Sequence, residues 1–190
     1  MENLLKQIGE CKVCESSLPH GCRPVLQASR HSKIAIIGQA PGRVVHASGI
    51  PWDDKSGDNL RAWLGVTKAE FYNPDLFALI PMGFCYPGTG KSGDLAPRKE
   101  CAPLWHEELM NRMPDIELFL LFGQYAQKYY LKDRLPSNLT ETVKNYKQYL
   151  PQYLPLPHPS PRNNIWLKKN EWFALELLPE LRSLVKAAMP

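Results

Sequence analysis

The run Ile116–Phe122 constrains the fold most, because after Glu117 it contains no polar side chain. Such a run predicts a strand that is buried on both faces, as in a parallel sheet covered by helices on each side. Three further short apolar runs predict strands at Lys33–Ile37, Leu76–Pro81 and Tyr153–Leu156. Segments with helical spacing separate these runs, so the alternation predicts a three-layer α/β/α sandwich around a four-stranded parallel sheet.

The segments between the strands predict their connections. A helix is expected over Ser56–Leu64, where apolar residues recur at helical spacing, with Ser56 or Asp58 as its cap. A second helix is expected over Thr140–Tyr149, with its first residue as the cap. The polar, glycine-rich stretch Arg43–Lys55 predicts an irregular loop.

Length and composition limit the number of domains and the classes of partner. The 190 residues are expected to form one domain, 1–190, which is large enough to bury a core without cross-links. No apolar run approaches the ~18 residues of a membrane span, and residues 1–11 lack the blocks of a signal peptide. We therefore expect a cytoplasmic protein without a membrane partner, and a monomer. A net charge of +4 is compatible with a polyanionic partner, although the pI of 8.8 lies below the ~9 typical of dedicated nucleic-acid modules.

Five cysteines in a chain expected to stay in a reducing compartment favour a metal site over disulfides. Cys11 and Cys14 form a C-x2-C pair. Cys85 and Cys101 lie 16 positions apart in loop 82–103, whose four glycines and three prolines predict irregular structure throughout. Four thiolates suit a tetrahedral sulfur site that holds an iron-sulfur cluster or zinc. The alternative is that these are ordinary buried thiols, and the fifth cysteine has no assigned role.

A glycine-rich turn follows the first predicted strand and consists of Gly38, Gln39, Ala40, Pro41 and Gly42. Its backbone N–H groups can hold an anion or a base that has left the DNA stack. The motif matches neither the Walker A sequence nor G-x-G-x-x-G. The alternative is a tight turn that needs glycine only for its backbone conformation.

The segment 49–54 places an aromatic ring and two carboxylates close in sequence to this turn. Trp52 can stack on a base, an interaction worth ~1–3 kcal/mol. Asp53 and Asp54 share the loop and offer negative charge next to that ring. The alternatives are a partly buried structural tryptophan and two solvated loop carboxylates.

The sequence H-P-S-P-R-N follows the fourth predicted strand at positions 158–163. His158 can donate a hydrogen bond to developing negative charge. Ser160 can bind a phosphate, and Arg162 can neutralise one. The alternative is a rigid proline turn. Because parallel strands leave their carboxyl ends at one edge of the sheet, this segment and the turn 38–42 are expected to face one pocket.

Four motifs, in this order, resemble the uracil-DNA glycosylase superfamily. They are G-Q-A-P-G after the first strand, G-x-P-W ending at Trp52, H-P-S after the last strand, and the four-cysteine layout. The cysteine layout, with its C-x2-C near the amino terminus, is similar to the iron-sulfur branch of that superfamily, family 4. The resemblance spans residues 11–166.

The resemblance implies a DNA base-excision repair enzyme that hydrolyses the N-glycosidic bond of uracil, or of another deaminated or damaged base, after flipping it out of the stack. It implies that turn 38–42 lines the catalytic pocket, that Trp52 stacks on the base and that His158 stabilises the departing base. It also implies that Ser160 and Arg162 hold a flanking phosphate. The four cysteines would carry a structural 4Fe-4S cluster that pins their loop against the amino terminus.

Two positions depart from the pattern of that branch. Gln39 stands where the branch has a glutamate, and a glutamine can orient a water but cannot take its proton. Pro81 stands where the branch has an asparagine that pairs with the uracil edge. Asp53 or Asp54 is our preferred source of the missing anion, and Asp94 in the cysteine loop is an alternative. In a third interpretation, the H-P-S histidine and the phosphates of the substrate carry most of the catalysis.

The sequence therefore supports two classes of function. The first is a base-excision glycosylase. The second is a DNA-binding protein of the same fold that recognises a lesion without cleaving the glycosidic bond, which the absent glutamate and asparagine favour. A nucleotide-binding enzyme acting on free nucleosides is a weaker third interpretation, which the basic segment 162–169 disfavours.

Overall fold

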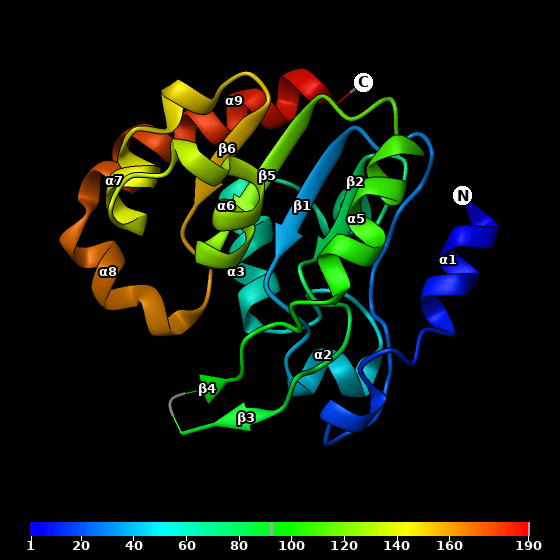
Figure 1. Ribbon diagram of the computed structural model, residues 1–190. Helices are drawn as coiled ribbons and strands as arrows, with labels where there is room; N and C mark the ends of the chain where they lie inside the picture. The colour runs from blue at the N-terminus through cyan, green and yellow to red at the C-terminus, as the bar shows by residue number, and fades with distance from the viewer. Residues whose placement is uncertain (92, 190) are drawn as a thin grey trace.

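The computed structural model describes residues 1–91 and 93–189, and a four-stranded parallel sheet lies at its centre (Figure 1). The strands are ordered β2-β1-β5-β6, and each neighbouring pair is parallel. This confirms the predicted sheet. The strands of the sheet are β1 (Ile34–Gly38), β2 (Phe77–Pro81), β5 (Leu118–Phe122) and β6 (Tyr153–Leu156), and a separate hairpin consists of β3 (Thr89–Gly90) and β4 (Gly93–Asp94).

Helical elements cover both faces of the sheet. In chain order they are α1 (Glu2–Gly9), η1 (Glu15–Ser17), α2 (Arg43–Ser48), α3 (Lys55–Leu64), α4 (Lys68–Phe71), α5 (Cys101–Asn111), α6 (Gly123–Leu131), η2 (Lys132–Arg134), α7 (Leu139–Lys144), η3 (Tyr146–Tyr149), η4 (Pro161–Asn163), α8 (Asn164–Lys169), the π-helix η5 (Phe173–Leu177) and α9 (Leu178–Ala188). Within residues 1–91 and 93–189, none of these helices combines the length and the apolar character that crossing a bilayer requires.

Strand β1 shows why the strands are continuous apolar runs. Ile34 and Ile36 belong to the core layer that contains α3, α7 and α9, whereas Ala35 and Ile37 belong to the layer that contains α1, α5 and α6. Successive side chains point to opposite faces of a sheet, so a strand covered on both faces needs an apolar residue at every position. The predicted three-layer α/β/α sandwich is therefore confirmed.

The expectation of an irregular loop over Arg43–Lys55 is wrong for its first half, which forms α2. This helix buries Val45 and ends at Gly49, whose φ of 75° is the left-handed conformation that closes many helices. A six-residue helix is too short to show an apolar period, so composition dominated the sequence signal. The expected absence of regular structure in loop 82–103 is also wrong, since the β3–β4 hairpin and the start of α5 lie within it.

Two helix starts differ from their predicted caps. Helix α3 is capped by Asp54, whose Oδ1 accepts from the N–H of Gly57 at 2.9 Å, in place of Ser56 or Asp58. The segment expected to form one helix from Thr140 is split into α7 and η3, and the side chain of Asn138 is the cap of α7. Both true caps have extended backbone and a short polar side chain, and several neighbours of the same chemical type compete in sequence for that position.

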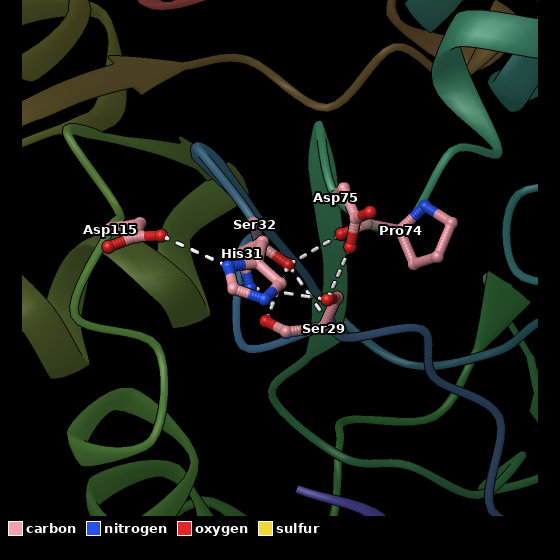
Figure 2. A network of polar contacts seen from close by, with 6 residues as sticks. All are labelled: Ser29, His31, Ser32, Pro74, Asp75 and Asp115. Carbon is pink, nitrogen blue, oxygen red and sulfur yellow. Dashed lines mark hydrogen bonds and ion pairs between the residues drawn. The ribbon is translucent and has the colours of Figure 1, made fainter.

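The amino-terminal edge of the sheet is held by a polar network that involves Ser29, Ser32 and Asp75 (Figure 2). The buried Ser32 hydroxyl donates to the carbonyl of Pro74 at 2.7 Å, just before β2. His31 Nδ1 lies 3.5 Å from a carboxylate oxygen of Asp115, shortly before β5. This network joins the segments that enter three parallel strands, and it lies at the opposite edge from the strand ends that carry the glycine-rich and histidine motifs.

Candidate active site

A cavity of about 450 Å³ opens at the carboxyl edge of the sheet, which is large enough to hold a nucleobase. In Figure 1, the β3–β4 hairpin and α2 lie beyond the arrowhead of β1, at this edge. The predicted site residues that line the cavity are Gly38, Gln39, Ala40, Pro41, Gly42, Trp52, Asp54, His158, Ser160 and Arg162. The structure thus brings both sequence motifs to one pocket, as parallel topology requires.

The turn 38–42 packs against Trp52 and Gly123, which fix its shape. A Cβ added to Gly38 would lie 2.8 Å from the ring of Trp52, so a larger residue cannot occupy this position without moving the indole. The side-chain amide of Gln39 lies against Gly123, the first residue after β5, where a Cβ would come within 3.1 Å of Gln39 Nε2. Gly123 has a φ of 81°, which also favours glycine. The amide of Gln39 therefore lies across the ends of β1 and β5.

Trp52 lies between the turn and the histidine motif. Its ring stacks on His158 with centroids 5.5 Å apart and meets Phe122 edge-on at 6.0 Å. Its backbone has a φ of 57°, which is uncommon for a bulky residue and is found where the surroundings fix the conformation. Here the surroundings include Gly57, since a Cβ on Gly57 would lie 1.7 Å from the carbonyl oxygen of Trp52. The loop also receives a hydrogen bond from the Tyr72 hydroxyl to the carbonyl of Pro51, at 2.9 Å.

His158 is a half-buried titratable group in this cavity. Burial lowers its pKa to about 4, and the nearby Asp54 carboxylate partly opposes that effect. The imidazole is therefore neutral above about pH 4 and carries one N–H donor. Two amides hold its backbone in place: Asn163 donates to the carbonyl of His158 at 2.7 Å, and Asn59 donates to the carbonyl of Pro159 at 2.9 Å.

The two neighbouring aspartates of the 49–54 loop have different surroundings. Asp54 lines the cavity and uses one oxygen to cap α3. Asp53 is absent from the cavity lining among the described residues, and its charge contributes to the raised pKa of Tyr72, for which burial is the main cause. Of the two carboxylates that the sequence favoured, the structure brings only Asp54 into the cavity.

Arg162 and Ser160 connect the histidine motif to the β3–β4 hairpin. The hydroxyl oxygen of Ser160 accepts from the backbone N–H of Arg162 at 3.3 Å, which starts η4. The guanidinium of Arg162 lies against Gly93, where a Cβ would come within 2.1 Å of Nη1. Gly93 has a φ of 135°, a backbone conformation that favours glycine. The hairpin and the histidine motif therefore meet at the mouth of the cavity.

The backbone from Pro81 to Cys85 runs from this cavity to the cysteines. The N–H of Met82 donates to the carbonyl of Gly38 at 2.9 Å, and the N–H of Gly83 donates to that of Gln39 at 3.0 Å. These bonds continue the pairing of β1 with β2 into the turn itself. The N–H of Phe84 then faces Cys101 Sγ at 3.4 Å. One short segment thus contacts both the glycine-rich turn and a cysteine sulfur.

His106 supports the start of that segment from behind. Its Nε2 lies 3.1 Å from the carbonyl of Pro81, and its Nδ1 lies 2.8 Å from the hydroxyl of Tyr130. Because a carbonyl can only accept, Nε2 donates and Nδ1 accepts the Tyr130 proton. Burial lowers the pKa of His106 to about 4, so this arrangement is the neutral imidazole.

The folded protein is expected to lose stability as the pH falls from neutral toward 4, because the buried His106 stays neutral while the unfolded chain takes up a proton near pH 6.5. Between about pH 7 and about pH 5 this one group should lower the free energy of unfolding by about 2 kcal/mol. Urea titrations at both values measure the difference. His106→Gln should reduce it by that amount, whereas an unchanged difference would contradict the assigned proton state.

A second cavity is lined by the sulfur-bearing side chains Cys11, Cys14, Cys22, Cys85 and Cys101. Burial raises the pKa of Cys101 to about 12 and that of Cys85 to about 11. Among the described residues, no three His, Cys, Asp or Glu side chains converge as a ready-made site for a metal ion. The four predicted cysteines nevertheless share one cavity, and Cys22, to which the sequence assigned no role, lies with them.

Sequence reasoning missed several residues that position the site. Asn59, Asn163 and Gly57 are separated in sequence from the groups that they hold, and amides and glycines are too common to be informative there. The one signal that the sequence offers is the position of Asn163 at the end of the H-P-S-P-R-N motif, where a polar cap would close a turn.

The family comparison agrees with this geometry. A family model described as the Uracil DNA glycosylase superfamily matches residues 26–182, which include the whole sheet, the glycine-rich turn and the histidine motif. This match covers well over half of the chain. The chain therefore belongs to the uracil DNA glycosylase superfamily.

Proposed function

We propose that this protein is a DNA repair glycosylase that hydrolyses the N-glycosidic bond of uracil, or of another deaminated or damaged base, flipped out of DNA. The observation that carries the proposal is a half-buried, neutral His158 in a base-sized cavity beside the glycine-rich turn. Membership of the superfamily supports action on DNA in general.

The chemistry needs stabilisation of negative charge on the departing base. A neutral imidazole N–H can donate to a base oxygen as that charge develops, and it needs no change in protonation to do so. The low pKa of His158 keeps it in this form throughout the neutral range. Trp52, which stacks on His158, keeps the imidazole oriented and excludes water from one of its sides. Flipping costs least for damaged or mismatched bases, which supplies part of the selectivity.

Incubation of the full chain with single- and double-stranded oligonucleotides that carry uracil, hypoxanthine or xanthine, followed by alkali, tests the proposal. Alkali-labile breaks at one of these bases are expected. Tight binding to the lesions without breaks would instead support the second function, lesion recognition without cleavage, which the glutamine at position 39 favours. If the protein produces no breaks and shows no lesion-selective binding, both functions are contradicted.

We also propose that Cys11, Cys14, Cys85 and Cys101 hold a 4Fe-4S cluster. Their side chains line one cavity, and sets of four cysteine thiolates are the usual ligands of such clusters. Arg98 and Trp105 line the same cavity, and the Nε of Arg98 and the Nε1 of Trp105 are buried without a hydrogen-bond partner among the described residues. Such N–H donors and the positive charge of Arg98, which contacts Cys14, suit an anionic group rich in sulfur.

The cluster would act as a structural element for the pocket. In the segment 81–85, Cys85 comes shortly after the two residues whose N–H groups pair with Gly38 and Gln39, and Cys101 Sγ accepts from the N–H of Phe84 between them. Because that segment also contributes Pro81 to the cavity wall, fixing the cysteines fixes one side of the base pocket. The catalytic groups themselves lie in the other cavity, so the proposed role does not require the cluster to react.

Loss of a ligand should remove the metal and loosen the pocket. Protein purified without oxygen is expected to be brown, with a broad absorbance near ~400 nm and about four irons per chain. Cys101→Ser should lose most of the iron and melt at lower temperature. Cys22 lines the same cavity, and Cys22→Ser should keep the iron content and the melting temperature of the wild type. A colourless wild type that contains zinc, or Cys101→Ser that keeps its iron, would contradict the assignment.

A further inference from the structure

Hydrolysis of a glycosidic bond is accelerated by a group that takes a proton from the attacking water. Gln39 cannot do this, because a glutamine side chain has no basic site at neutral pH. Within the described part of the chain, the carboxylates that line the cavity are those of Asp54 and Asp94. The choice between them rests on where each lies and on what else it does.

Asp54 already has a structural task. Its Oδ1 accepts the N–H of Gly57 at 2.9 Å and caps α3, so this carboxylate is fixed at the helix end. Its charge also acts on His158, whose pKa it raises against the larger effect of burial. Asp54 therefore belongs to the wall that holds the imidazole, which is the side of the departing base.

Asp94 lies at the end of β4, on a different loop. A Cβ added to Gly42 would lie 3.2 Å from Asp94 Oδ2, so this carboxylate is placed directly over the last residue of turn 38–42. A side chain at position 42 would therefore press against this carboxylate. The hairpin that carries it is closed by the bond from the N–H of Leu95 to the carbonyl of Gly88, at 2.8 Å, and is contacted by Arg162 at Gly93.

We propose that Asp94 is the catalytic base of this glycosylase. The inference rests on the function proposed above. The Asp94 carboxylate accepts a proton from a water that lies over the turn, and the water oxygen forms a bond to C1′ of the flipped nucleotide. The C1′–N bond breaks, and its electron pair leaves with the base, whose developing charge is held by the N–H of His158. The proton on Asp94 then passes to solvent and restores the carboxylate.

Asp94 and His158 thereby stabilise opposite charges of the transition state. The sugar becomes positive and the base negative as the bond lengthens. The carboxylate of Asp94 on the turn side faces the positive partner, and the neutral donor of His158 faces the negative one. This arrangement explains how a chain with glutamine at position 39 retains a working pocket, since the anion comes from the hairpin instead of the turn.

Asp94→Asn removes the basic oxygen with little change in shape and tests the inference. Single-turnover excision from the oligonucleotide that the wild type cleaves best should slow by about 100-fold. Binding to an oligonucleotide that carries a tetrahydrofuran abasic analogue should stay unchanged or tighten, because a negative charge next to DNA phosphates has been removed. Asp53→Asn, on the loop residue outside the cavity lining, is the matched control and should stay within about threefold of the wild type.

Each outcome decides the inference. An Asp94→Asn rate within about threefold of the wild type overturns it and leaves the glycosylase function intact. A parallel loss of rate and of affinity also overturns it, because it indicates that Asp94 only supports the hairpin. If the wild type excises none of the bases tested, the proposed function fails and this inference fails with it.

Discussion

His158→Ala is expected to lower the single-turnover rate of base excision by about 100- to 1000-fold, the usual cost of removing one donor to a developing anion. The imidazole of His158 is a half-buried donor in the cavity, and its pKa of about 4 keeps it neutral near pH 7. Affinity for DNA that carries an abasic analogue should change little, since Ser160 and Arg162 are the residues that we expect to bind the phosphate. Rates and affinities measured on the same protein preparation separate the two effects.

The pH dependence sharpens this expectation. Because the pKa of His158 lies at about 4, its titration should cause no change in the excision rate of the wild type near pH 6.5. His158→Gln keeps an N–H donor and should retain more activity than the alanine variant. His31→Ala, at the opposite edge of the sheet and largely exposed, is the matched control and should excise at the wild-type rate. A His158→Ala variant that folds, as judged by circular dichroism, and excises normally would falsify the role.

Gly57→Ala is expected to lower the free energy of unfolding by about 3 kcal/mol, because it forces atoms together in a packed region. The added Cβ would lie 1.7 Å from the carbonyl oxygen of Trp52, and that neighbour is backbone, which cannot rotate away. Either α3 or the 49–54 loop must move. Since the loop carries Trp52 and Asp54 into the cavity, excision should fall together with the melting temperature.

Gly9→Ala supplies the comparison for this variant. Gly9 ends α1, and a Cβ there has no heavy atom within 4 Å. Replacing a helical glycine by alanine is neutral or stabilises by up to about 1 kcal/mol, so its unfolding curve should match or exceed that of the wild type. Equal stability of the Gly57 and Gly9 variants would show that the close approach of Gly57 to Trp52 does not exist in solution.

Local patterns in the chain are enough to predict the sheet and the place of the pocket. A strand covered on both faces consists of apolar residues. The apolar runs of β1 and β5 can therefore be recognised in the sequence without any knowledge of the strands that they pair with. Parallel topology then brings the segments that follow β1 and β6 to one edge. For this reason turn 38–42 and His158 are expected from the sequence to share a cavity, and they do.

The polar groups that enter the cavity are selected by contacts between distant segments. Asp53 and Asp54 are adjacent and chemically alike, yet only Asp54 lines the cavity, because Gly57 and the φ of Trp52 set the direction of that loop. Asp94 reaches Gly42, and Arg162 reaches Gly93, through a hairpin that has no hydrophobic period. Burial leaves a local pattern in the sequence, whereas the direction of a loop side chain depends on contacts with distant residues, which no local pattern records.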